Sequence, residues 1–198
     1  YSSSYMDERS QYIITKEELT AAGWTAQTPV LQSIAFHVSA ASTTVLNTFT
    51  VRVSHTSASS YANGSFLAGT TTVSTYTGNV TTTNGWNTYT FASPFNYNET
   101  MNLVITVSFN NSVSGSNSIV LTSIQPTYKS VFRRENLSTA AISSSSTGTL
   151  SYYRPNMQLK FGPAAATKSM LQNEQEETQI LEKRDLLIYP NPIATGNK

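Results

Sequence analysis

The chain has 198 residues, of which only 12% are charged, and its formal net charge is +1. This balance excludes the strongly basic surface with which proteins recruit nucleic acid or anionic membranes. The absence of cysteine excludes disulfide bonds and thiolate metal sites, and the chain is long enough to bury a core without such cross-links.

Alternation of apolar and polar residues is the main structural signal, and it predicts β-strands. In 103–109, for example, Leu103, Ile105, Val107 and Phe109 fall on one face of an extended chain. The same pattern predicts about nine strands, at 11–14, 34–38, 49–53, 72–77, 86–91, 103–109, 118–124, 128–133 and 157–161. Each strand has one apolar face, so we expect an all-β antiparallel sandwich of two sheets with jelly-roll-like topology.

One short helix is predicted at 16–22. Thr15 is its candidate N-cap, Glu18 completes a capping box, and Gly23 ends the helix. The Ser- and Thr-rich stretch 138–149 has low complexity and predicts a mobile loop.

The composition changes after residue 162, which predicts three parts: a sandwich domain at 1–162, a linker at 163–184, and the start of a further domain at 185–198. The linker is rich in Ala, Gln and Glu, and the last part begins with a short apolar strand. A single strand does not fold alone. It must therefore pair with the sandwich, with a partner chain, or with residues outside this sequence.

Few residues suit acid–base chemistry. Between residues 23 and 162 the carboxylates are Glu99 and Glu135, and neither lies in a catalytic motif. His37 and His55 lack carboxylate or histidine neighbours at metal-ligand spacing, so we expect surface imidazoles. We therefore predict that the chain is not an enzyme.

Asp7 is the candidate metal ligand. Together with oxygens from Gln11 or from an Asn-rich loop, its carboxylate could hold Ca²⁺, and no other cofactor is expected. The alternative is that Asp7 forms an ion pair with Arg9 or Arg154, or caps a turn.

Aromatic residues are the candidate ligand-binding groups. Tyr61, beside the turn sequence Asn63-Gly64, and the pair Tyr152 and Tyr153 are expected to be exposed, where their rings could stack on sugar rings. Other aromatic residues are expected to pack in the core: Trp86, Phe91, Phe95 and Tyr97.

Several segments carry a family resemblance. They are Asp7–Tyr12, Glu18–Gly23, Gly85–Phe91, Pro94-Phe95, Asn102–Val104 and Arg154–Met157. In this order they resemble a family of uncharacterised β-sandwich modules in large surface and secreted proteins of gliding and related bacteria. The resemblance covers residues 1–162 and implies a fold and a location, without an established activity.

The tail carries a second resemblance. The sequence Leu187-Ile188-Tyr189-Pro190-Asn191-Pro192 is similar to the opening strand of the C-terminal sorting domain read by the type IX secretion system. This implies that Tyr189, Pro190, Asn191 and Pro192 belong to a sorting signal, that the secretion machinery is a partner, and that the chain is secreted or lies on the outer face of the outer membrane.

The sequence begins with Tyr1 and shows no signal peptide, so we expect a processed or excised piece. No apolar run approaches the roughly 20 residues that span a bilayer. The leading hypothesis is a non-catalytic binding or adhesion module, with glycans or other surface proteins as ligands. The alternatives are a structural subunit that assembles through its β-edges and tail strand, and an accessory domain of a larger secreted enzyme.

Overall fold

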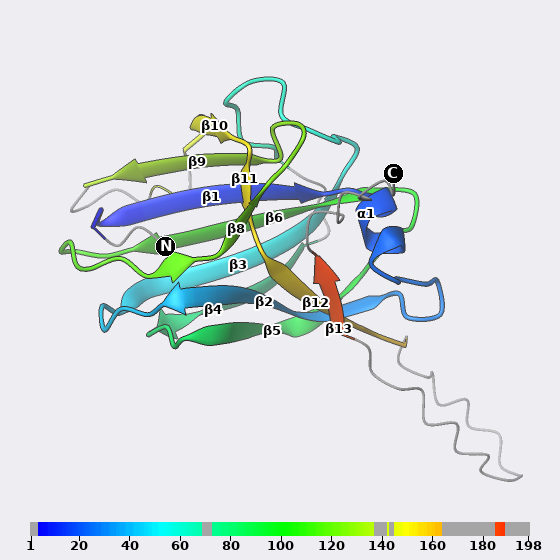
Figure 1. Ribbon diagram of the computed structural model, residues 1–198, viewed down its shortest axis with the longest axis horizontal. Helices are drawn as coiled ribbons and strands as arrows, with labels where there is room; N and C mark the ends of the chain where they lie inside the picture. Colours follow the sequence, from blue (N-terminus) through cyan, green and yellow to red (C-terminus); the bar gives the residue numbers. More distant parts are fainter. Residues whose placement is uncertain (1–3, 69–72, 137–141, 143–144, 164–184, 189–198) are drawn as a thin grey trace, which may run out of the picture.

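The computed structural model describes residues 4–68, 73–136, 142, 145–163 and 185–188. These residues form thirteen strands and one short helix, and every strand pairing is antiparallel. Two main sheets make up the molecule (Figure 1). The predicted all-β sandwich is confirmed.

Sheet A has six strands in the order β10-β9-β1-β6-β3-β4. Its strands are β1 (Asp7–Ile14), β3 (Leu46–Thr56), β4 (Val73–Val80), β6 (Asn102–Asn110), β9 (Ser130–Glu135) and β10 (Thr149–Ser151). Strands far apart in sequence are neighbours here, since β6 lies between β1 and β3. This is the jelly-roll-like feature, because the chain moves from one sheet to the other between them.

Sheet B has the order β13-β12-β2-β5. Its strands are β2 (Val30–Ala40), β5 (Gly85–Asn96), β12 (Met157–Gly162) and β13 (Asp185–Ile188), and β7 (Ile119–Val120) also pairs with β2. A two-stranded sheet joins β8 (Thr122–Ile124) to β11 (Tyr153–Pro155). Pro94 lies in β5 where the ladder with β2 is interrupted, so its missing N–H removes no bond between paired residues.

The core lies between the two sheets and follows the predicted alternation. Leu103, Ile105, Val107 and Phe109 of β6 are buried in it, together with Val51 and Val53 of β3. Side chains of β12, β2 and β5 face them from sheet B. Phe91, Phe95 and Tyr97 are buried there as predicted.

A second, smaller core covers the outer face of sheet A, and the sequence did not predict it. Ile13 of β1 and Val131 of β9 pack there against Tyr61, Phe66 and Leu67. The described part of 138–149, expected as a mobile loop, is bonded to this layer: the Ser146 carbonyl accepts from the Phe66 amide, and the Gly148 amide donates to the Gly64 carbonyl. Sheet A is therefore covered on both sides at β1.

Most strands are longer than predicted, β10 and β11 were not predicted, and two further differences have a clear structural cause. The predicted strand 11–14 begins at Asp7, because β6 and β9 both pair with β1 and satisfy the backbone of its polar half. The predicted strand 118–124 is divided between β7 and β8, because the chain leaves β2 at Leu121 and goes on to pair with β11.

The helix α1 (Lys16–Ala21) starts with the predicted capping box. The Thr15 side chain accepts from the Glu18 amide, and the Glu18 carboxylate accepts from the Thr15 amide at 2.8 Å. Gly23 follows the helix at φ 98°, a conformation that glycine adopts without strain. No helix among the described residues is both long and apolar enough to cross a membrane.

A buried ion pair joins α1 to the end of the sandwich. Arg154 on β11 is only 2% exposed, and its Nη2 lies 2.8 Å from Glu18 Oε1. Its Nη1 donates to Glu18 Oε2 at 3.0 Å and to the Ile13 carbonyl at 2.8 Å. Burial opposes ionisation of Glu18, but the hydrogen bond and charge of Arg154, with help from Thr15 and Lys129, lower its pKa below the ordinary value.

β13 pairs with the free edge of β12. Asp185 to Ile188 lie opposite Lys160 to Met157 in antiparallel register. Of the three pairings open to the tail strand, the structure therefore shows the one with the sandwich (Figure 1).

Replacing Arg154 by Met should lower the free energy of unfolding by about 3–5 kcal/mol, because Glu18 and the Ile13 carbonyl lose their buried partner. Urea denaturation of the variant measures this loss. The control is Arg133→Met, which breaks the more exposed pair with Glu135 and should change the stability by less than about 1 kcal/mol. Equal effects of the two substitutions would contradict the central role of Arg154.

Candidate functional site

The outer face of sheet B carries a polar trough that runs along β2. Directly opposed residues of β12, β2 and β5 form two rows across the sheet. The rows are Lys160–Ser33–Thr90 and Gln158–Ala35–Thr88. Because Ile34, Leu159 and Tyr89 between them are buried in the core, alternation turns these six side chains outward.

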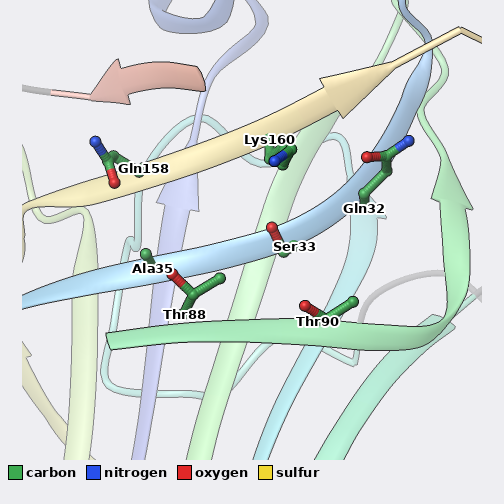
Figure 2. A pocket seen from close by; sticks show the side chains of 7 residues that line it. All are labelled: Gln32, Ser33, Ala35, Thr88, Thr90, Gln158 and Lys160. Atoms are coloured by element: carbon green, nitrogen blue, oxygen red, sulfur yellow. The ribbon is translucent and has the colours of Figure 1, made fainter. Parts of the chain in front are cut away.

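The depth of the trough comes from the sizes of its residues. Ser33 and Ala35 on the central strand are small, while the flanking strands carry longer side chains such as Lys160 and Gln158 (Figure 2). The hollow between them has a volume of about 240 Å³. Its lining is therefore a floor of small residues with walls of amides, hydroxyls and one ammonium group.

Gln32 closes one end of the trough. It lies where the pairing of β2 with both neighbours shifts register, and its side chain passes over Gly162. A Cβ at residue 162 would lie 2.4 Å from Gln32 Nε2, so glycine is needed there for Gln32 to keep this position.

The His37–Trp86 pair extends the same face at the other end. The two residues are directly opposed on β2 and β5, and their rings meet edge to face at 4.9 Å and 87°. His37 faces outward as predicted, but Trp86 lies on the outer face instead of in the core, because it shares the alternation of Thr88 and Thr90. An aromatic surface thus follows the polar rows.

The trough can hold a ligand mainly by hydrogen bonds. The amides of Gln32 and Gln158 both donate and accept, as do the hydroxyls of Thr88 and Thr90. Lys160 is the one charged side chain among the seven lining residues, so the site favours neutral or anionic partners over cationic ones.

The predicted ligand-binding tyrosines are separated in the structure. Tyr152 and Tyr153 are 43% and 57% exposed, as predicted, and the Tyr152 ring lies 4.1 Å from that of Tyr128. The prediction for Tyr61 is wrong, since it is 4% exposed in the second core and its hydroxyl donates to Gln11 Oε1 at 2.9 Å. The nearby turn marks a loop, but that loop folds back over sheet A.

Asp7 is fully buried at the start of β1, opposite Asn110 and Glu135. Its proposed partner Arg154 pairs instead with Glu18, and Arg9 donates to the Ser145 carbonyl. Within the described ranges, no three His, Cys, Asp or Glu side chains gather closely enough to hold a metal ion. The Ca²⁺ site at Asp7 stays a prediction.

The predicted sorting residues Tyr189, Pro190, Asn191 and Pro192 lie outside the described residues.

His55 differs from its expected surface position. It is 8% exposed, its ring lies against Phe95 and Tyr97, and its Nε2 accepts from the Asn98 amide at 2.8 Å. Burial lowers the pKa of His55 below its ordinary value of 6.5. The imidazole therefore acts as a neutral acceptor that fixes the turn after β5.

The trough residues were not singled out from the sequence. Alternation did place Gln158 and Lys160 on one face of their strand. It could not show that Ser33 and Thr90 lie beside them, because strand neighbours are set by the tertiary fold.

No protein-family model, curated protein or solved structure matches this chain. The site is therefore interpreted from its own geometry.

The lowered pKa of His55 predicts a pH dependence of stability. As the pH falls below 6.5, the unfolded chain binds a proton before the folded chain does, so stability present above pH 6.5 is lost. Urea unfolding between pH 7 and pH 5 should show this decline, and His55→Gln, which keeps an acceptor without titrating, should reduce it. Because the lowered pKa of Glu18 lies below this window, that carboxylate does not contribute to the change. An identical decline in the variant would contradict the assignment.

Proposed function

We propose that this chain is a non-catalytic binding module of a surface or secreted protein exported by the type IX secretion system, and that the trough on sheet B holds a linear glycan. The observation that carries the proposal is the line of hydrogen-bonding side chains along β2 with Trp86 at its end. Successive rows on one face of a strand are about 7 Å apart. The three rows therefore offer contacts over about 14 Å, which suits an extended ligand.

The side chains match the chemistry of a sugar chain. Sugar hydroxyls donate and accept, and the amides and hydroxyls of Gln32, Gln158 and Thr88 can do both in return. The flat face of a sugar ring packs against an aromatic ring, which Trp86 supplies beside the trough. The location rests on the family resemblance of the body and on the sorting-signal resemblance of the tail.

Binding of soluble linear polysaccharides tests the proposal. Lys160→Ala should weaken the affinity for the polysaccharide that binds the wild type by about tenfold, because a hydrogen bond to a charged group is lost. Ala35→Leu should also weaken it, since a larger side chain fills the floor of the trough without removing a polar group. Titration calorimetry with a panel of neutral and acidic polysaccharides measures both effects.

The matched control is Arg52→Ala, which removes one positive charge from an exposed position on sheet A. It should leave the affinity unchanged. If no polysaccharide binds, or if Lys160→Ala and Ala35→Leu both bind like the wild type, the trough is not a glycan site.

A second candidate function is assembly through strand pairing. The observation that favours it is the antiparallel ladder between β12 and β13, since a strand from another copy could occupy the same edge. The chain would then act as a structural subunit.

Light scattering of the full chain over a range of concentrations tests this second candidate. Oligomers should form and should be lost in Leu187→Pro, because proline removes an N–H from the strand that pairs with β12. Gln172→Pro in the predicted linker is the control and should still assemble. A monomer at every concentration would contradict assembly through this edge.

A further inference from the structure

A second hollow lies on the inner face of sheet A, on its β1 and β9 side. Three pairs of residues are directly opposed there on β1 and β9. The pairs are Glu8–Arg134, Ser10–Phe132 and Tyr12–Ser130. Tyr12 packs in the core between the sheets, so alternation turns all six side chains toward the inner side.

A separate part of the chain forms the roof. Residues 117–120 and Thr122, with Tyr153 and Pro155 of β11, face β1 and β9 across the hollow, and Phe36 of β2 lines its inner end. Ser151 belongs to β10 and lies beside Ser130 in sheet A. The pocket between floor and roof has a volume of about 410 Å³. This volume falls in the range of small-molecule sites. We name it the side pocket, and it shares no residue with the trough on sheet B.

An ion pair sits on the floor of the side pocket. The Glu8 side chain is almost fully buried, and it accepts from Ser10 Oγ at 2.7 Å and from Arg134 Nε at 3.2 Å. Arg134 is partly exposed, and its guanidinium carbon lies 4.5 Å from the centre of the Phe132 ring. Because Arg134 meets Glu8 through Nε, its terminal amino groups can still donate to a ligand.

Ser130 supplies an independent sign of a ligand. It is 2% exposed and lines the side pocket, and its Oγ has no hydrogen-bond partner among the residues that the structure describes. A buried hydroxyl without a partner is unfavourable, and its position next to the cavity allows a ligand to supply the missing bond.

The Tyr12 hydroxyl is a further hydrogen-bonding group at the inner end. Burial raises the pKa of Tyr12, the nearby Glu8 carboxylate adds to this effect, and a hydrogen bond with Ser10 opposes it. The phenol therefore keeps its proton at neutral pH.

We propose that the side pocket binds one neutral sugar ring, such as the terminal residue of a glycan. Glu8 and Arg134 together carry no net charge, which favours an uncharged ligand. Two adjacent hydroxyls would meet the carboxylate and the guanidinium, and a third would pair with Ser130 Oγ. The apolar face of the ring would pack on Phe132 or on Tyr153, which is exposed at the rim.

A titration of the full chain with methyl glycosides of neutral hexoses, followed by saturation-transfer NMR, tests this site. Ser130→Ala should weaken binding by about two- to tenfold, because one hydrogen bond is lost. Its melting temperature should stay equal or rise, since the variant removes an unpaired buried hydroxyl. Arg134→Lys should weaken binding as well, because lysine keeps the charge but loses the planar fork.

Ser108→Ala is the matched control, since Ser108 lies on the opposite face of the same sheet, and it should bind like the wild type. Glucuronic acid and glycine serve as the charged probes. The proposal is overturned if no neutral glycoside binds, if only a charged probe binds, or if Ser130→Ala and Arg134→Lys both leave binding unchanged.

The proposals for the side pocket and for the trough can be contradicted independently. Lys160→Ala should leave the binding of methyl glycosides intact, because Lys160 lies on the outer face of sheet B. Loss of glycoside binding in that variant would overturn the assignment to the side pocket, whereas failure of polysaccharide binding alone would bear only on the trough.

Discussion

The buried pair of Glu18 and Arg154 holds together parts of the chain that are 136 residues apart. Glu18 also completes the capping box of α1, and Arg154 also binds the carbonyl of Ile13 at the end of β1. The pair thus connects the start of α1, through Glu18, with the end of β1 and with β11, through Arg154. The charge of Arg154 is tolerated in the interior because it is paired with Glu18 and hydrogen-bonded to the Ile13 carbonyl, and losing Glu18 would leave a buried guanidinium without its counter-charge.

The positions of the two candidate sites follow from how the sheets are covered. Sheet A has the intersheet core on one side and the second core around Ile13, Tyr61 and Val131 on the other. The outer face of sheet B carries small and polar side chains at Ser33 and Thr90, which form the trough. The side pocket arises where residues 117–120 and Thr122, with Tyr153 and Pro155 of β11, face β1 and β9. Two hollows of different shape therefore occur on one sandwich.

Polar residues on strands mark both hollows, but for different physical reasons. On sheet B they face solvent, so hydroxyls and amides such as those of Thr88 and Gln158 are ordinary surface groups that the small floor residues gather into a trough. On β1 and β9 they face inward, where Glu8, Ser10 and Arg134 must satisfy one another. The inward set is the costlier one to maintain, because a buried hydroxyl such as that of Ser130, which has no hydrogen-bond partner among the described residues, loses its bonds to water.

The sequence by itself determined the all-β class, the faces of the clearly alternating strands and the capped helix, because alternation and capping act over a few neighbouring residues. Leu103 to Phe109 and the Thr15–Glu18 box are examples. It could not place Tyr61, whose loop folds back over sheet A, or His55, which is buried beside Phe95 and Tyr97. Only the tertiary structure decided that β1 lies between β6 and β9 and that β2 lies between β5 and β12. Those neighbours create both hollows, and they depend on packing between residues far apart in the sequence, such as Ser33 and Thr90 or Glu8 and Arg134, which no local pattern records.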